Sequence, residues 1–92
     1  MVKVDVPTIH REHGFSFRVF PNNHPPAHVH AWAHGSYVII QLPNWSEPAR
    51  VLGVVGRMKD VEVKQAVRIV QDNAEIMWNG WRMFHDEEAH GC

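Results

Sequence analysis

The sequence predicts an α+β domain in which a small antiparallel sheet of three or four strands is followed by a C-terminal amphipathic helix packed on one face. Apolar and polar residues alternate in several short runs before Leu42, which is the period of a half-buried strand. After Asp60 the apolar residues recur every three or four positions, as they do along one face of a helix. Turn residues separate the strand-like runs, so we expect antiparallel pairing.

The length and charge of the chain restrict its class. Ninety-two residues, 45% of them apolar, supply one domain with a modest core. The formal net charge of -1 excludes the strongly basic composition of a dedicated nucleic-acid binder, although local basic patches stay open. We expect a cytoplasmic protein that does not enter a membrane, because the single Cys92 cannot form an internal disulfide and no signal segment or long apolar span is present.

The first half of the chain carries the predicted sheet, over residues 7–56. Residues 1–6 alternate before Pro7 and read as an N-terminal extension or an edge strand. Residues 15–20 form a core strand, with Phe15 and Phe17 on one face. Residues 28–34 form the next strand, and Gly35 supplies a tight turn back into residues 37–42. Residues 50–55 form a last strand that Gly53 weakens.

The second half predicts one helix over residues 60–86, with Asp60 as its N-cap and residues 87–92 as a tail. Asn79 and Gly80 could break this helix, but the apolar spacing continues through them and favours one long or slightly kinked helix. The residues of the apolar face are Val63, Val67, Val70, Ala74, Met77, Trp81 and Phe84. One helix covers only part of a sheet, and four tryptophans are many for this length, so we expect a homo-oligomer, in its simplest form a homodimer.

Three histidines and two prolines lie within seven residues, in the segment 24–30 with the sequence His-Pro-Pro-Ala-His-Val-His. Each proline restricts the backbone and favours an extended residue before it, so the segment should form a stiff arm that leads into a strand. Small apolar residues of that strand face the core, and His28, His30 and Trp32 then point outward together. We therefore predict a ligand-binding site at His24, His28, His30 and Trp32.

Three interpretations of the histidines stay open. His24, His28 and His30 could hold Zn²⁺ or another divalent transition metal, with an open position for water and a further ligand from His10, His13, His34 or His85. They could instead be hydrogen-bonded parts of a rigid turn. They could also perform metal-free acid–base chemistry, such as RNA cleavage. Trp32 could stack on a base, but we favour a protein interface.

The order of these motifs resembles a family of small bacterial proteins known as domain of unknown function 4160. The similar features are Pro7-Thr8-Ile9, Gly14 before an aromatic strand, the segment from His24 to His30, and a helix with Ile76, Met77 and Trp81. The resemblance covers roughly Pro7 to Phe84. It implies no established activity, but it implies a genetic setting: members are often encoded beside another small uncharacterised domain, as in toxin–antitoxin pairs.

Two functional hypotheses follow. The first is a small binding or accessory protein, one member of a toxin–antitoxin-like pair, whose histidine site meets a partner protein from a neighbouring gene or binds a metal. The alternative is a small histidine-dependent hydrolase or ribonuclease. Scattered cations argue against the second, because a ribonuclease must neutralise a phosphate.

Overall fold

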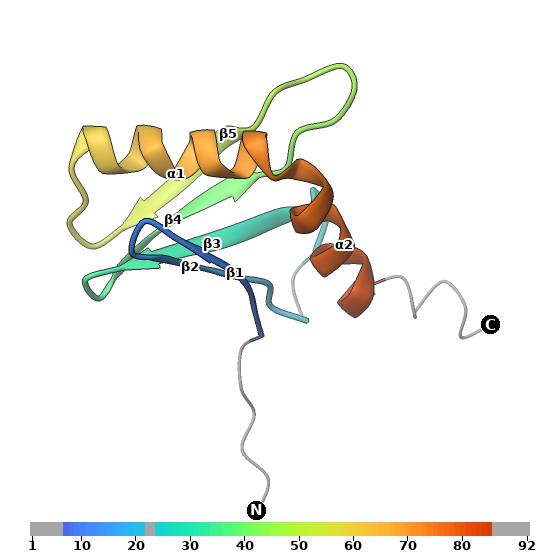
Figure 1. Ribbon diagram of the computed structural model, residues 1–92, viewed down its shortest axis with the longest axis horizontal. Helices are drawn as coiled ribbons and strands as arrows, with labels where there is room; N and C mark the ends of the chain where they lie inside the picture. Colours follow the sequence, from blue (N-terminus) through green and yellow to red (C-terminus); the bar gives the residue numbers. More distant parts are fainter. Residues whose placement is uncertain (1–6, 22–23, 86–92) are drawn as a thin grey trace, which may run out of the picture.

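The computed structural model describes residues 7–21 and 24–85, which form a five-stranded antiparallel sheet and two helices (Figure 1). The strands lie in chain order across the sheet, so each pairs with its neighbour in sequence. They are β1 (Thr8–Glu12), β2 (Phe15–Arg18), β3 (His28–Ala33), β4 (Ser36–Gln41) and β5 (Arg50–Val55), and they are followed by α1 (Asp60–Asp72) and α2 (Ala74–His85). None of the helices in this described part is long and apolar enough to cross a membrane.

The α+β class is confirmed, but the predicted number of elements is wrong. There are five strands rather than three or four, because Thr8–Glu12 pairs with β2 although Ile9 is its one aliphatic residue. There are two helices rather than one. The predicted extension at residues 1–6 and tail at residues 87–92 lie outside the described residues.

Both hairpins at one end of the sheet turn through a His-Gly pair. His13 and Gly14 have φ of 52° and 82°, and His34 and Gly35 have φ of 56° and 78°. Two successive positive φ angles match the right-handed twist of the flanking strands, and glycine tolerates the second at little cost. The tight turn predicted around Gly35 is therefore confirmed. The same kind of turn at His13-Gly14 lets β1 fold back and pair with β2.

The single helix predicted over residues 60–86 is divided at Asn73, and the backbone stays helical through Asn79 and Gly80. The Asn73 side chain donates a hydrogen bond from Nδ2 to the Ile69 carbonyl at 2.8 Å, where a continuing helix would be bonded by the backbone alone. The ladder nevertheless resumes at once, since the Met77 N–H donates to the Asn73 carbonyl. Lys59 rather than Asp60 is the N-cap of α1, and its N–H donates to the Glu62 carboxylate at 2.9 Å.

The helices cover one face of the sheet and bury the core there. Figure 1 shows α1 running along the sheet and α2 descending past the ends of the strands. Phe17, Val29 and Ile40 from the sheet are fully buried beneath Val70 and Met77 from the helices. The predicted apolar face of the helix is thus confirmed at its centre, while Val63 and Val67 pack only at the margin of the core.

Gly80 of α2 packs against the side chain of Ile9 on β1. A Cβ atom placed on Gly80 would lie 2.6 Å from Cδ1 and 2.7 Å from Cγ2 of Ile9. The glycine that seemed a weak point of the helix is therefore required by packing. It permits a backbone approach that any larger residue would push apart.

We expect Gly80→Ala to destabilise the protein, although alanine in a helix is intrinsically favoured over glycine by about 1 kcal/mol. The clash with Ile9 should reverse the sign, and Ile9→Val should relieve part of it. Urea unfolding of both single variants and the double variant measures this coupling. A gain in stability for Gly80→Ala alone would contradict the close approach.

Candidate functional site

Side-chain alternation in β3 places the predicted site on the face of the sheet that carries no helix. Val29 is paired with Ile40 and Ala31 with Val38, and all four are fully buried on the helix side. The residues between them, His28, His30 and Trp32, must then point to the other side. The predicted outward orientation of the three side chains is confirmed.

Neighbouring strands add three side chains to this face. Trp32 is opposite Tyr37 on β4, and His30 is opposite Arg18 on β2. Phe20 follows β2 and contacts the His30 ring, with centroids 4.5 Å apart. We call this set the His30 cluster; it comprises Arg18, Phe20, His28, His30, Trp32 and Tyr37.

Ring contacts run through the whole cluster. His30 lies 5.4 Å from His28 and 5.2 Å from Tyr37, centroid to centroid. Tyr37 stacks on Trp32 at 4.4 Å, and the Arg18 guanidinium lies over the Trp32 ring at 4.9 Å. A cation over an indole face is attracted by the electron-rich face of the ring. The cluster therefore ends in a positive charge held on an aromatic surface.

His30 is the buried centre of the cluster, with 9% of its surface exposed. Burial, together with a smaller contribution from the nearby His28, lowers the pKa of its imidazole to about 4. A histidine with such a pKa is neutral at pH 7. It can accept or donate a hydrogen bond through one nitrogen each, but it cannot supply a proton as an acid at neutral pH.

His28 joins the cluster to the end of α2. Its Nδ1 lies 2.8 Å from the Pro26 carbonyl, so this nitrogen carries the hydrogen and Nε2 carries the lone pair in the neutral ring. Its ring lies 5.5 Å from that of Trp81, which in turn stacks on His85 at 3.6 Å. His85 Nδ1 is 2.8 Å from the Trp81 carbonyl. A row of ring contacts therefore runs from His28 on β3 through Trp81 to His85 on α2.

Several polar atoms of the His30 cluster and of His85 are buried without a hydrogen-bond partner. In the described ranges, four side-chain nitrogen or oxygen atoms are buried without a hydrogen-bond partner. Three belong to the His30 cluster, namely Arg18 Nε, His30 Nδ1 and Trp32 Nε1, and the fourth is His85 Nε2. Such atoms are uncommon in folded proteins, because each costs about 1–3 kcal/mol when it loses water and gains no partner.

The predicted metal ligands are only partly brought together. His28 and His30 are neighbours on one face, whereas His24 is exposed in the arm before the cis Pro25–Pro26 bond. Across residues 7–21 and 24–85, no three His, Cys, Asp or Glu side chains are grouped as a metal site. The hydrogen bond from His28 Nδ1 to a carbonyl is nevertheless the arrangement that orients many metal-binding histidines. Metal binding stays a prediction.

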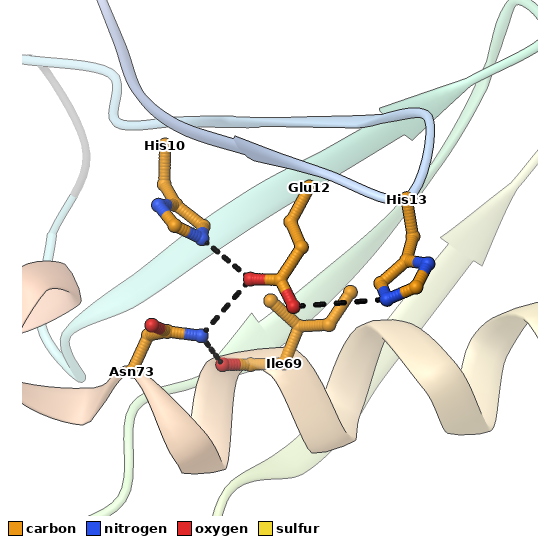
Figure 2. A network of polar contacts seen from close by, with 5 residues as sticks. All are labelled: His10, Glu12, His13, Ile69 and Asn73. Carbon is orange, nitrogen blue, oxygen red and sulfur yellow. Dashed lines mark hydrogen bonds and ion pairs between the residues drawn. The ribbon is translucent and has the colours of Figure 1, made fainter.

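The remaining histidines have other partners, and Figure 2 shows two of them around Glu12. The Glu12 carboxylate lies 2.8 Å from His10 Nε2 and 3.8 Å from His13 Nε2, and it accepts a hydrogen bond from Asn73 Nδ2 at 3.3 Å. The His10 hydrogen bond is the main cause of the lowered Glu12 pKa. This network fastens β1 to the bend between α1 and α2, so its role is structural.

His34 also lies away from the cluster. It occupies the turn between β3 and β4, where its Nε2 is 2.8 Å from Glu62 Oε2 at the start of α1. His10, His13 and His34 are therefore not placed as further ligands for His28 and His30. Of the four histidines named as further ligands, His85 is the one connected to His28, through the Trp81 ring between them.

Sequence reasoning missed four members of this region. The sequence pattern could have indicated Arg18 and Phe20, because they alternate with the core residues Phe17 and Val19. It could also have indicated Tyr37, since a two-residue turn at His34-Gly35 places Tyr37 opposite Trp32. It could not have indicated Trp81, because the contact of Trp81 with His28 depends on where α2 runs after the bend at Asn73.

Comparisons with known proteins give one match. The family model described as domain of unknown function (DUF4160) matches residues 14–82, which include β2 to β5, α1, most of α2 and every residue of the His30 cluster. Neither the curated proteins nor the solved structures contain a match.

We expect His30 to make the protein less stable in mild acid. The unfolded chain takes up a proton near the ordinary histidine pKa of about 6.5, whereas folded His30 does so only near pH 4. The free energy of unfolding should therefore fall by about 2 kcal/mol from this residue between pH 7 and pH 5. Urea unfolding at the two pH values should show a smaller fall for His30→Gln. Exposed His24→Gln is the control, and equal falls in all three chains would refute the effect.

If the histidines bind a metal, Zn²⁺ should raise the melting temperature of the native chain by mass action. The effect should weaken as the pH falls, because the ligands must be neutral and protons compete with the metal for them. His28→Ala should abolish the shift, while His34→Ala, which lies outside the cluster, should retain it. Thermal unfolding of untagged protein with and without Zn²⁺ measures this. No shift in the native chain would exclude the metal interpretation.

Proposed function

The chain belongs to the DUF4160 family, and because this membership assigns no activity, we propose from the site itself that the protein is a small binding protein whose partner docks on the His30 cluster. The partner we propose is a small protein encoded by a neighbouring gene, in a pair of the toxin–antitoxin type. The proposed place of action is the cytoplasm, in keeping with the single cysteine of the sequence.

The observation that carries the proposal is the set of partnerless polar atoms on the uncovered face. Arg18 Nε, His30 Nδ1 and Trp32 Nε1 are buried without a hydrogen-bond partner among the rings of the cluster. A docking protein with backbone carbonyls or carboxylates could offset their desolvation after small side-chain movements. Arginine, tyrosine and tryptophan are the residues most enriched where binding energy is concentrated in protein interfaces.

The charge of the site favours a protein over a nucleic acid. Arg18 is the one Arg or Lys of the His30 cluster, and the strand registers place Arg11 and Arg50 farther out on the same face. The formal charge of the chain is -1. A single-stranded nucleic acid would use stacking platforms of this kind, but it also needs a row of cations along its phosphates. A protein that presents a few acceptors to Arg18 and Trp32 needs no such row.

The alternative function, a hydrolase or ribonuclease, needs an acid as well as a base. The low pKa of His30 makes it neutral at pH 7, so it is suited to the base and not to the acid. His28 would then have to supply the proton. RNA cleavage by the native chain would be the sign of this alternative.

We expect Trp32→Ala to weaken binding of the neighbouring-gene protein by more than tenfold, since truncating a central aromatic typically costs about 2 kcal/mol or more. Trp32→Phe should restore part of the affinity by restoring the stack on Tyr37. Titration calorimetry of the purified pair measures both. Trp45→Ala is the matched control, because Trp45 is 98% exposed in the loop after β4.

The same proteins should be incubated with single-stranded RNA. Unchanged affinity of Trp32→Ala for the partner would refute docking on this face. RNA cleavage by the native chain that disappears in His28→Ala would replace the binding function with the alternative. Thermal unfolding of each variant separates loss of a contact from loss of the fold.

A further inference from the structure

The β5 edge of the sheet is unusually apolar. In the described part of the chain eight large apolar side chains are exposed, and four of them are on β5: Val51, Leu52, Val54 and Val55, each 40–45% exposed. β5 is the last strand in the sheet order, so one of its edges has unpaired backbone N–H and C=O groups. Strand edges of this kind are templates for another strand.

Two of these valines belong to the core side of the sheet. Val54 is paired with Val38 and Val51 with Ile40, and both partners are fully buried under the helices. Val51 and Val54 nevertheless stay 40% and 44% exposed, because α1 covers the sheet only up to this margin. The apolar layer between sheet and helix is therefore open at β5.

The opposite edge is protected. β1 carries His10, Arg11 and Glu12, and Glu12 is fastened to the helix bend through Asn73. The start of β1 lies against α2 at Gly80. Charged side chains and a covering helix are the usual devices that prevent edge pairing, and β5 has no charged residue or proline from Val51 to Val55.

We propose that a second copy of this chain pairs with β5, the two strands lying antiparallel about a two-fold axis near Gly53. In that arrangement the uncharged apolar run from Val51 to Val55 of one copy lies along the same run of its partner, so apolar side chains of the two edges cover each other. No like charges oppose each other, and Gly53 meets its own copy without steric conflict. A two-fold contact of one patch with itself is the commonest closed form of protein assembly.

The geometry of β5 predicts a weak and reversible dimer. Leu52 is the extra residue where the register with β4 shifts, and such a bulge increases the local twist of an edge. Pairing of one six-residue strand also buries less than the standard interface of about 1,600 Å². The dimer should therefore form with rising concentration and dissociate on dilution.

Sedimentation equilibrium over a wide concentration range tests the proposal. The native chain should show a monomer–dimer equilibrium, and Val54→Lys should raise its dissociation constant at least about tenfold. Val61→Lys is the matched control, because Val61 is an exposed valine on α1, 67% accessible and away from β5. Monomer at every concentration, or a dimer insensitive to Val54→Lys, would overturn the proposal.

A cross-link tests the pairing directly. Gly53→Cys in a Cys92→Ser background introduces a side chain where nothing lies within 4 Å of the added Cβ. Opposed residues of antiparallel strands have Cα atoms about 4.5–5.5 Å apart, within the range of a disulfide. Oxidation should give a covalent dimer on non-reducing gels, and Val61→Cys in the same background should not.

The dimer can be separated from partner docking on the other surface. Trp32→Ala should leave self-association unchanged, and Val54→Lys should leave the His30 cluster intact. A chain that stays monomeric alone, yet loses its neighbouring-gene partner in Val54→Lys, would assign the edge to that partner instead of a second copy.

Discussion

Because side chains alternate across β3, burying Val29 and Ala31 under the helices leaves His28, His30 and Trp32 on the uncovered side. A shift of one residue in the pairing would move these side chains into the core, where two imidazoles and an indole N–H would need partners. The apolar pattern of the core therefore fixes the site as firmly as it fixes the fold. The position of His28, His30 and Trp32 on the open face therefore depends on the packing of Val29 and Ala31 in the core.

The bend at Asn73 connects this face with the helical layer. A straight helix would carry its last turns along the sheet, but α2 passes the strand ends, and Trp81 reaches His28 there. Glu12 holds the bend from β1 by accepting a hydrogen bond from Asn73 (Figure 2). A polar contact on one edge of the sheet therefore helps to position an aromatic ring at the end of β3, and the two parts of the structure are mechanically linked.

Local patterns in the sequence were sufficient for the fold class, the turn at His34-Gly35 and the face of β3, because each depends on a few adjacent residues. They were insufficient for β1, whose Thr8–Glu12 segment becomes a strand through its pairing with β2 and not through its own periodicity. They also did not indicate the division of the helix, since Gly80 is explained by Ile9 and Asn73 by Glu12, residues about seventy and sixty positions away. At the site, alternation gave His28, His30 and Trp32, but the buried state of His30 required the positions of Phe20 and Tyr37.

The order of the strands, each beside its neighbour in the chain, also bears on how the fold can form and vary. Every pairing in the sheet closes a short loop, and proteins rich in such local contacts reach their native topology quickly. The hydrogen bond from Asn73 to Glu12, by contrast, joins residues 61 positions apart. A meander also allows a strand to be gained or lost at its margin without changing any other pairing. β1 occupies such a margin: it precedes residues 14–82, which the family model matches, and the pairings from β2 to β5 do not involve it.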